Sequence, residues 1–452
     1  MAISKQKVHF IGIGGIGTSA LARWFLVKNW AVSGSDLLAS KITNELVNEG
    51  AKIKIGHKKA NLGAGTDLVI YNQAIPTDNA ELKEAKKTGI PIFSYPQAIG
   101  KLTQEYETIA IAGAHGKSTT TAFVSLALIK AGFDPTVIIG TRLKDFGPAS
   151  HGKNFRKGGG EYLVVEACEW RNAFLNYSPA AAIITNIDKE HLDFFKNISN
   201  VKKSFLKFIF KVKIGGVLVL NKDDKNLKSL DRQVKKIAAK NKLRVFWYDL
   251  NSSSGISLKI SKVLKVPGRH NLSNALAAYT LARQMGISEK IILEAFSRYR
   301  GIWRRLELRG YLKLTIPVYD DYAHHPTEIK ASLQALREKY PRNKIICVFQ
   351  PHQAERLKIL FNDFVSAFHE ADKLILLPVY EVPGRDKKNK KFTSEKLAKA
   401  ISGKKKSPEV IYLPRPEKLP SVIENSKLKI ENCVIVMMGA GDIVKYTDLL
   451  LR

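Results

Sequence analysis

The chain has 452 residues, of which 45% are apolar and 25% are charged, as in an ordinary globular protein with room for two to four domains. Lys and Arg (73) outnumber Asp and Glu (41), and the resulting formal net charge of +32 favours anionic ligands of any class. No stretch of 18 apolar residues occurs, so we expect no membrane-spanning helix.

Cysteine usage and the pattern of basic residues exclude further classes. Cys168, Cys347 and Cys433 lie far apart without a CxxC pair, so we expect a reducing, cytoplasmic compartment and no zinc knuckle. The basic residues form short clusters that are typical of solvated helix faces and loop tips. Since neither a KH unit nor an aromatic RNP stripe is present, we expect no nucleic-acid partner.

Short apolar runs alternate with longer amphipathic stretches along the chain. The runs are KVHFIGIG, AVSGSD, DLVIYN, PIFSY, TIAIAG, EYLVVEA, AAIITN and GGVLVLN. This alternation predicts an α/β fold in which helices cover parallel sheets. Three blocks emerge, with predicted boundaries at residues 1–105, 106–300 and 301–452.

The first block opens with a glycine-rich turn after a predicted strand. Gly12, Gly14 and Gly17 satisfy GxGxxG, and Asp36 follows 19 residues later. This pattern is typical of a dinucleotide site, which leaves an NAD-dependent dehydrogenase as one interpretation. The turn suits a nucleotide-diphosphate sugar equally well, because it binds a pyrophosphate.

The second block opens with a shortened phosphate loop, GAHGKS. A strand over Thr108 to Ala112 precedes it, and a helix is predicted from about Lys117. Helix N-terminal N–H groups favour polyphosphate, so Lys117 would reach the β and γ phosphates of ATP and Ser118 would bind Mg²⁺. Thr119 to Thr121 offer further hydroxyls. ATP and Mg²⁺ are therefore the expected cofactors.

Two more polar residues follow neighbouring strands of the same block. Glu166 is placed just past the strand in VVEACEW, and His191 follows the strand in AAIITN. A carboxylate and an imidazole that face Ser118 could complete a metal site.

Further motifs follow in the second half of the chain: GRHNLSNALAA at 268–278, GIWRRLE at 301–307, DDYAHHPTEI at 320–329, FQPHQAER at 349–356 and GAGD at 439–442. In this order, and together with the two glycine turns, they resemble the Mur ligase family over essentially the whole chain. The likeness is strongest to members that join L-alanine to the lactyl carboxylate of UDP-N-acetylmuramate through an acyl phosphate, in cytoplasmic peptidoglycan precursor synthesis.

The resemblance implies three domains: an N-terminal Rossmann-like domain for the UDP-sugar, a central ATPase-type domain, and a C-terminal Rossmann-like domain for the amino acid. It implies an ATP site that consists of Gly113, Gly116, Lys117, Ser118, Thr119, His270, Asn271, Asn274, Arg305 and Asp321. The implied Mg²⁺ residues are Ser118, Glu166 and His191. The implied substrate residues are Gly14, Gly15, Gly17, Asp36 and His57 for the UDP-sugar, and Tyr322, His324, His352 and Arg356 for L-alanine.

Four residues are candidates for the chemistry itself. Lys117 and Arg305 would stabilise the transferred phosphoryl group, and His191 or His324 would take a proton from the alanine ammonium. Two departures from the family pattern stand in YNQAI, at residues 71–75, and in QPHQAER, where Gln353 replaces an arginine.

Several alternatives stay open at this stage. Asn271 and Asn274 could cap a helix, Arg304 and Arg305 could form ordinary salt bridges, and His324 could be a turn residue before Pro326. At the level of function, the rivals are a ligase that attaches an intact tripeptide to the same sugar nucleotide and an ATP-regulated nucleic-acid-binding protein.

Overall fold

The structure is a computed structural model that describes residues 5–147, 152–382, 391–405, 407–424 and 432–451. It contains three sheets built mainly from parallel strands, which confirms the predicted α/β class, and all eight apolar runs form strands. The chain divides into two compact units. The first holds residues up to Glu190, Asn197–Val263 and Ser273–Tyr299, and the second holds His191–Lys196, Leu264–Leu272 and the residues from Arg300 onward.

The first sheet is entirely parallel, with the strand order β3-β2-β1-β4-β5. Its strands are β1 (Lys7–Ile11), β2 (Ala31–Asp36), β3 (Lys52–Ile55), β4 (Leu68–Tyr71) and β5 (Ile92–Ser94). Its helices are α1 (Ile16–Val27), α2 (Lys41–Asn48), α3 (Ala80–Lys87) and α4 (Tyr95–Glu105). The strand order reverses beside β1, so the first glycine turn lies at the point where α/β sheets bind ligands.

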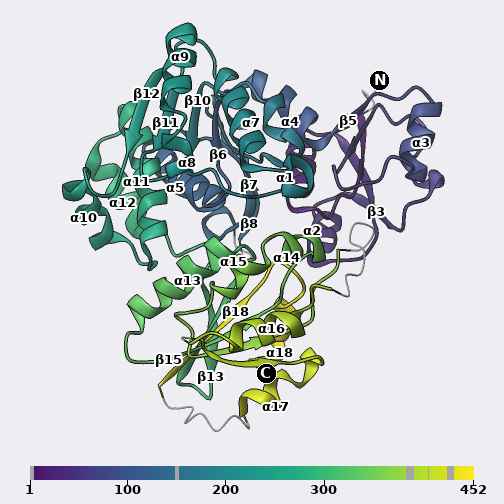
Figure 1. Ribbon diagram of the computed structural model, residues 1–452. Helices are drawn as coiled ribbons and strands as arrows, with labels where there is room; N and C mark the ends of the chain where they lie inside the picture. Colours follow the sequence, from purple (N-terminus) through teal and green to yellow (C-terminus); the bar gives the residue numbers. More distant parts are fainter. Residues whose placement is uncertain (1–4, 148–151, 383–390, 406, 425–431, 452) are drawn as a thin grey trace. The chain divides into compact units, whose positions relative to one another are not determined.

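The second sheet has seven strands in the order β12-β11-β10-β6-β9-β7-β8, and only the β7–β8 pair is antiparallel (Figure 1). The strands are β6 (Glu107–Ala112), β7 (Thr136–Leu143), β8 (Lys153–Arg156), β9 (Tyr162–Ala167), β10 (Ala181–Ile184), β11 (Val217–Asn221) and β12 (Arg244–Tyr248). Five of the six residues of β6 are buried, as expected for a central strand whose two faces are covered.

Helices α5 to α12 follow along the same part of the chain. They are α5 (Lys117–Lys130), α6 (Leu192–Phe195), α7 (Ile198–Phe210), α8 (Lys225–Lys228), α9 (Asp231–Asn241), α10 (Ser254–Val263), α11 (Arg269–Gln284) and α12 (Glu289–Arg298). Strands β9 and β10 flank β6 on opposite sides, so the phosphate loop also lies where the strand order reverses.

The third sheet has six strands in the order β13-β14-β18-β15-β16-β17, and only β13 is antiparallel to its neighbour. The strands are β13 (Glu307–Leu312), β14 (Ile316–Asp321), β15 (Lys344–Phe349), β16 (Lys373–Leu376), β17 (Glu409–Tyr412) and β18 (Cys433–Met438). The helices are α13 (Pro326–Lys339), α14 (Ala354–Ile359), α15 (Phe361–Val365), α16 (Ser394–Ser402), α17 (Leu419–Glu424) and α18 (Val444–Leu450). Short 3₁₀ turns cover Lys59–Asn61, Lys144–Phe146, Trp170–Asn176 and Pro416–Lys418.

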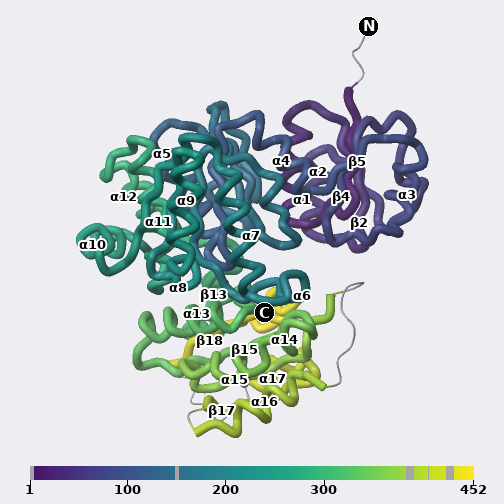
Figure 2. The backbone as a smooth tube through the Cα atoms, turned by 45° about the horizontal axis from the view of Figure 1, so that its top comes forward, coloured from purple at the N-terminus to yellow at the C-terminus, as the bar shows by residue number. Residues whose placement is uncertain are grey.

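Within the first unit, α1 joins the first two sheets. It lies beside α2 and α4 (Figure 2) and packs on the β7–β8 hairpin. The buried Arg23 of α1 donates to Glu45, to Glu49 and to the side chain of Asn154, while Arg142 of β7 donates to the same Glu45. Because the first two sheets share one unit, the boundary near residue 105 stays a prediction.

No helix in the described ranges is long and apolar enough to cross a membrane.

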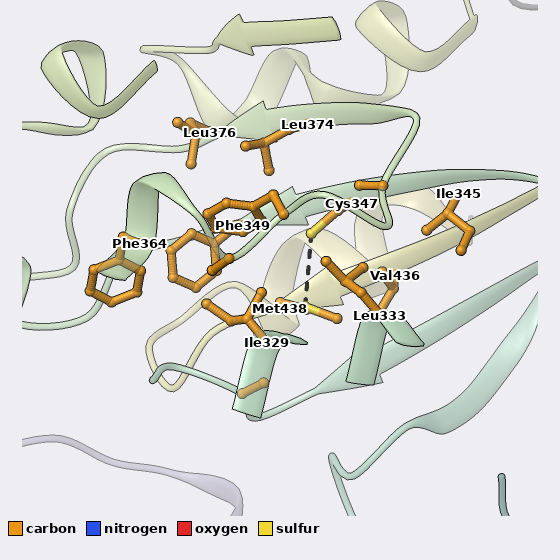
Figure 3. Packing of buried hydrophobic residues seen from close by; sticks show 14 of the residues in the cluster. Ile329, Leu333, Ile345, Cys347, Phe349, Phe364, Leu374, Leu376, Val436 and Met438 are labelled. Atoms are coloured by element: carbon orange, nitrogen blue, oxygen red, sulfur yellow. Dashed lines mark hydrogen bonds between the residues drawn. The ribbon is translucent and has the colours of Figure 1, made fainter. Parts of the chain in front are cut away.

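An apolar core lies on one face of the third sheet (Figure 3). Phe349 of β15 is fully buried, and its ring centroid lies 5.8 Å from that of Phe364 and 5.3 Å from that of Phe368. The thiol of Cys347 lies 3.8 Å from the sulfur of Met438 on the neighbouring strand. This core supports the strand ends that carry the polar residues of the second unit.

We expect Phe349→Ala to lower the free energy of unfolding by about 3–5 kcal/mol, because it leaves a cavity between two aromatic rings. Phe349→Leu keeps most of the volume and should cost less than about 1.5 kcal/mol. Urea unfolding followed by tryptophan fluorescence measures both variants. Equal losses for the two variants would show that Phe349 is not packed as described.

Candidate active site

The phosphate loop joins β6 to α5, and its glycines have left-handed backbone angles. Gly113 has a φ of +137° and Gly116 a φ of +81°. A Cβ on Gly116 would lie 2.4 Å from Oδ1 of Asn274, and one on Gly113 would lie 2.0 Å from Oγ1 of Thr185. The predicted loop is therefore confirmed as a tight turn whose two glycines cannot carry a side chain.

Residues that follow β10, the strand beside β6, hold the phosphate loop in place. The His115 amide donates to Oδ1 of Asn186 at 2.8 Å, and the Ala114 amide donates to its carbonyl at 3.1 Å. Thr185 Oγ1 donates to the His115 carbonyl at 2.6 Å. These bonds hold the loop backbone in one conformation, and His115 Nε2 lies 3.0 Å from Asp188.

Lys117 begins α5, and its side chain turns back over the loop. The ammonium donates to the carbonyls of Gly113 at 2.6 Å and Ala114 at 3.0 Å, and to Oε2 of Glu169 at 3.2 Å. Burial by itself disfavours the charged form, but the carboxylates of Glu169 and Glu166 outweigh it and raise the pKa of Lys117. The loop therefore carries a permanent cation.

Glu166 lies inside β9 and not just past it, which corrects the sequence prediction by two residues. Its Oε1 accepts the Gly140 amide at 2.6 Å, and its charge contributes to the raised pKa of Lys117. Ser118 lies in the first turn of α5. A carboxylate and a hydroxyl are the oxygen donors that Mg²⁺ prefers, so these two residues fit a magnesium site.

The three threonines that follow Ser118 differ in burial. Thr119 is 5% exposed, whereas Thr120 and Thr121 are fully buried on the inner face of α5. Of the three further hydroxyls that the sequence offers, those of Thr120 and Thr121 are therefore buried in the core, and the predicted contact of Thr119 with ATP stays a prediction.

Three side chains from other segments lie against the first glycine turn and the start of α1. Asp36 Oδ2 accepts the Gly14 amide at 2.8 Å, and its Oδ1 accepts the amide of Leu37. A Cβ on Gly15 would meet the amide of Asn72 at 2.5 Å, and one on Gly17 would meet the ring of Tyr95 at 2.8 Å. Asp36 thus fixes the turn, and its predicted contact with the sugar nucleotide stays a prediction.

His57 follows β3 at the same edge of the sheet. The Gly56 amide donates to the Asp36 carbonyl at 2.8 Å, and His57 Nδ1 lies 2.8 Å from the hydroxyl of Ser35. The predicted UDP-sugar residues therefore share one edge of one sheet.

In the second unit, the four residues predicted around the amino acid lie in one cluster. The His324 ring centroid is 5.3 Å from that of Tyr322 and 6.0 Å from that of His352. His352 stacks on Tyr380 with centroids 5.5 Å apart, and Nη1 of Arg356 lies 3.2 Å from His352 Nδ1. The sequence did not predict Tyr380.

The adjacent arginines of GIWRRLE have different roles. Arg304 is buried, and it donates to Asp320 at 3.1 Å and to the Gly439 carbonyl at 2.6 Å, so it joins β14 to the GAGD turn. Arg305 contacts Glu328 at 3.3 Å and lies over the Tyr322 ring. Both arginines therefore form salt bridges, as the alternative interpretation expected. Of the two, only Arg305 has a partly exposed side chain.

Asp321 is buried and His270 is partly buried, and both lie near Arg305 in the same unit. Burial raises the pKa of Asp321 to about 6, although Arg305 opposes this shift. Burial, together with Arg305, lowers the pKa of His270 to about 4, so the imidazole is neutral at pH 7. The next residue, Asn271, lies inside α11 and donates from its side chain to the Pro267 carbonyl at 2.7 Å, which is not the bond of a helix-capping residue.

His191 has a left-handed φ of 54° and directly precedes α6, which packs against α14, the helix of Arg356. It therefore belongs to the second unit, whereas Ser118 and Glu166 belong to the first. The predicted role of His191 at a metal stays a prediction.

Comparisons with known proteins agree along the chain. Family models match residues 7–107 as the Mur ligase family, catalytic domain, residues 111–282 as the Mur ligase middle domain, and residues 304–441 as the Mur ligase, glutamate ligase domain. A UDP-N-acetylmuramate--L-alanine ligase from Aquifex aeolicus is 40% identical over 467 residues, which span 99% of this chain and 97% of that protein. The chain belongs to the Mur ligase family.

Solved structures support the same membership of the Mur ligase family. The UDP-N-acetylmuramate-alanine ligase from Thermotoga maritima matches with a TM-score of 0.78 and 28% identity, over 98% of each chain. A murein peptide ligase from Psychrobacter arcticus matches with a TM-score of 0.70 over 99% of this chain and 98% of that chain. Its identity of 23% shows the shared fold only.

Sequence reasoning missed several residues that contact the predicted site residues within each unit. Glu169 is the partner of Lys117, and the second acid of EACEW was the available signal. Tyr95 and Tyr380 come from segments without a motif, so no local pattern indicates that their rings pack against Gly17 and His352.

The raised pKa of Asp321 predicts a pH dependence of stability. The folded state keeps the proton up to about pH 6, whereas the unfolded chain loses it near pH 4, so this group's stabilisation is lost as the pH rises between these values. Between pH 4 and pH 7, wild type should lose about 2 kcal/mol of unfolding free energy relative to Asp321→Asn. Urea titrations at each pH measure the difference.

Asp363 is exposed, so Asp363→Asn serves as the matched control. Its plot of unfolding free energy against pH should run parallel to that of wild type. A parallel curve for Asp321→Asn as well would contradict the assignment of a buried, protonated carboxyl.

Proposed function

We propose that this chain is an ATP-dependent ligase that joins L-alanine to the lactyl carboxylate of UDP-N-acetylmuramate, in cytoplasmic peptidoglycan precursor synthesis. The observation that carries the proposal is the Lys117 ammonium within a glycine loop, beside Ser118 and Glu166, in a member of the Mur ligase family. The near full-length relative that is named for this reaction supports the choice of substrates.

The reaction must first convert a carboxylate into an electrophile. A carboxylate repels a nucleophile and has no leaving group that departs from carbon at neutral pH. Attack of the lactyl carboxylate oxygen on the γ phosphorus of ATP breaks the bond to ADP and forms an acyl phosphate. Attack of the alanine amine on the acyl carbon then forms the amide and releases phosphate.

The first step brings an anion to a polyanion, so it requires concentrated positive charge. Lys117 supplies a fixed cation at the loop, and the N-terminus of α5 adds N–H groups that would bind a phosphate. Bound Mg²⁺ would neutralise phosphate charge, and the oxygens of Ser118 and Glu166 would hold it. Arg305 is the proposed second cation.

The second step requires a free amine, because alanine is an ammonium ion at neutral pH. His324 Nδ1 lies 3.0 Å from the Tyr322 carbonyl, which can only accept, so Nδ1 carries the proton and Nε2 is the acceptor in the neutral ring. This tautomer suits a base that takes the ammonium proton. We therefore favour His324 over His191 for this role, with Tyr322, His352 and Arg356 around the amino acid.

Phosphate release with UDP-N-acetylmuramate, ATP and a panel of amines tests the proposal. We expect turnover with L-alanine, and less with glycine or serine. Turnover with the tripeptide L-alanyl-D-glutamyl-diaminopimelate and none with L-alanine would replace the proposal with the tripeptide ligase. ATP hydrolysis that requires RNA or DNA and no UDP-sugar would overturn the ligase assignment altogether.

Lys117→Ala should lower kcat at least about 1,000-fold, because it removes the cation that faces the transferred phosphoryl group. Calorimetric binding of UDP-N-acetylmuramate should be unchanged. Lys130→Ala, at the opposite end of the same helix, is the matched control and should keep full activity, since its ammonium pairs with Glu294. Loss of sugar-nucleotide binding in Lys117→Ala would mean that the lysine is structural.

A further inference from the structure

A buried carboxylate beside β1 and β2 accepts hydrogen bonds from four donors. Glu81, in the first turn of α3, is fully buried. It accepts hydrogen bonds from His9 Nε2 at 2.9 Å, Ser35 Oγ at 2.7 Å, Asn61 Nδ2 at 2.8 Å and the Lys58 amide at 3.1 Å. Burial alone would raise the pKa of Glu81, but the bonds from His9, Ser35 and Asn61 lower it, so the group is an anion that only accepts.

This anion sets the direction of the next hydrogen bond. The Ser35 hydroxyl has one proton, which it donates to Oε2 of Glu81, so its oxygen must accept from His57 Nδ1 at 2.8 Å. Oε1 of Glu81 lies 3.5 Å from the same Nδ1 and favours the same direction. His57 therefore carries its proton on Nδ1, and Nε2 of the neutral ring is a hydrogen-bond acceptor.

His57 Nε2 is buried and has no hydrogen-bond partner among the residues that the structure describes. A buried acceptor without a donor destabilises the protein, and a bound donor would remove this cost. The side chain keeps 11% of its surface exposed, so the ring borders the protein surface. The ring lies at the same sheet edge as Asp36 and the first glycine turn.

We propose that Glu81, acting through Ser35, fixes His57 as an acceptor that selects the imide N3–H of a uracil base. This inference rests on the proposed function, in which the first sheet binds a uridine nucleotide. Uracil presents a donor at N3, whereas cytosine presents an acceptor there, so the tautomer of one histidine discriminates between the two bases. Glu81 is a positioning residue, because it acts on the base only through Ser35 and His57.

Glu81→Gln tests the relay, because an amide must place one NH₂ group where the carboxylate had an oxygen. The Lys58 amide is an obligatory donor, so the oxygen stays on that side and the NH₂ faces His9 and Ser35. Ser35 then accepts from Gln and gives its proton to His57 Nδ1. The proton of the neutral ring moves to Nε2, which becomes a donor.

Calorimetric titration with UDP, CDP and N3-methyl-UDP measures the selectivity, with a non-hydrolysable ATP analogue and Mg²⁺ occupying the ATP site. Wild type should bind UDP at least about tenfold more tightly than CDP or N3-methyl-UDP. In Glu81→Gln this preference should fall to about threefold or less. His57→Phe removes the acceptor without touching Glu81 and should lose the preference in the same way.

Ser33→Ala is the matched control, since Ser33 contacts the other nitrogen of His9 and is not part of the relay, so the preference should be kept. Wild-type binding of UDP without discrimination against N3-methyl-UDP would overturn this inference and leave the proposed function standing. The same holds if Glu81→Gln and His57→Phe keep the preference. No binding of UDP to wild type would overturn both.

Discussion

The candidate site depends on a cation that is held within a nearly buried loop. The Lys117 side chain is only 16% exposed, and a charge at such a place requires partners. The carbonyls of Gly113 and Ala114 and the carboxylate of Glu169 supply them, which keeps the ammonium charged and in place. A triphosphate offers stronger anionic partners than these carbonyls, so the same cation is available to a ligand.

The two glycine turns share one geometric cause. Each follows a buried central strand whose two parallel neighbours lie on opposite sides of it, β1 between β2 and β4, and β6 between β9 and β10, so the chain extends the sheet in opposite directions from that strand. Both turns therefore lie at reversal points, where helix N-termini and strand ends leave space for an anion. Asp36 accepts a backbone amide of the first turn and Asn186 accepts one of the second, so a side-chain oxygen holds the backbone of each turn.

The sequence predicted most of the fold because its apolar runs are short, regular and bounded by glycine turns. It also predicted that Tyr322, His324, His352 and Arg356 lie together, although only the family resemblance linked these motifs. Contacts between distant segments without a motif were not predictable. Tyr380 is an example, because its stacking on His352 depends on the tertiary course of the chain after β16 and on no local pattern.

The most direct test of the central claim is a crystal structure with a non-hydrolysable ATP analogue and Mg²⁺. We predict that the β and γ phosphates lie at the loop of residues 113–118, and that the Lys117 ammonium contacts them and no longer bonds to the Gly113 carbonyl. A triphosphate bound elsewhere, or a Lys117 side chain that keeps its bonds to the loop carbonyls beside a bound nucleotide, would contradict the account.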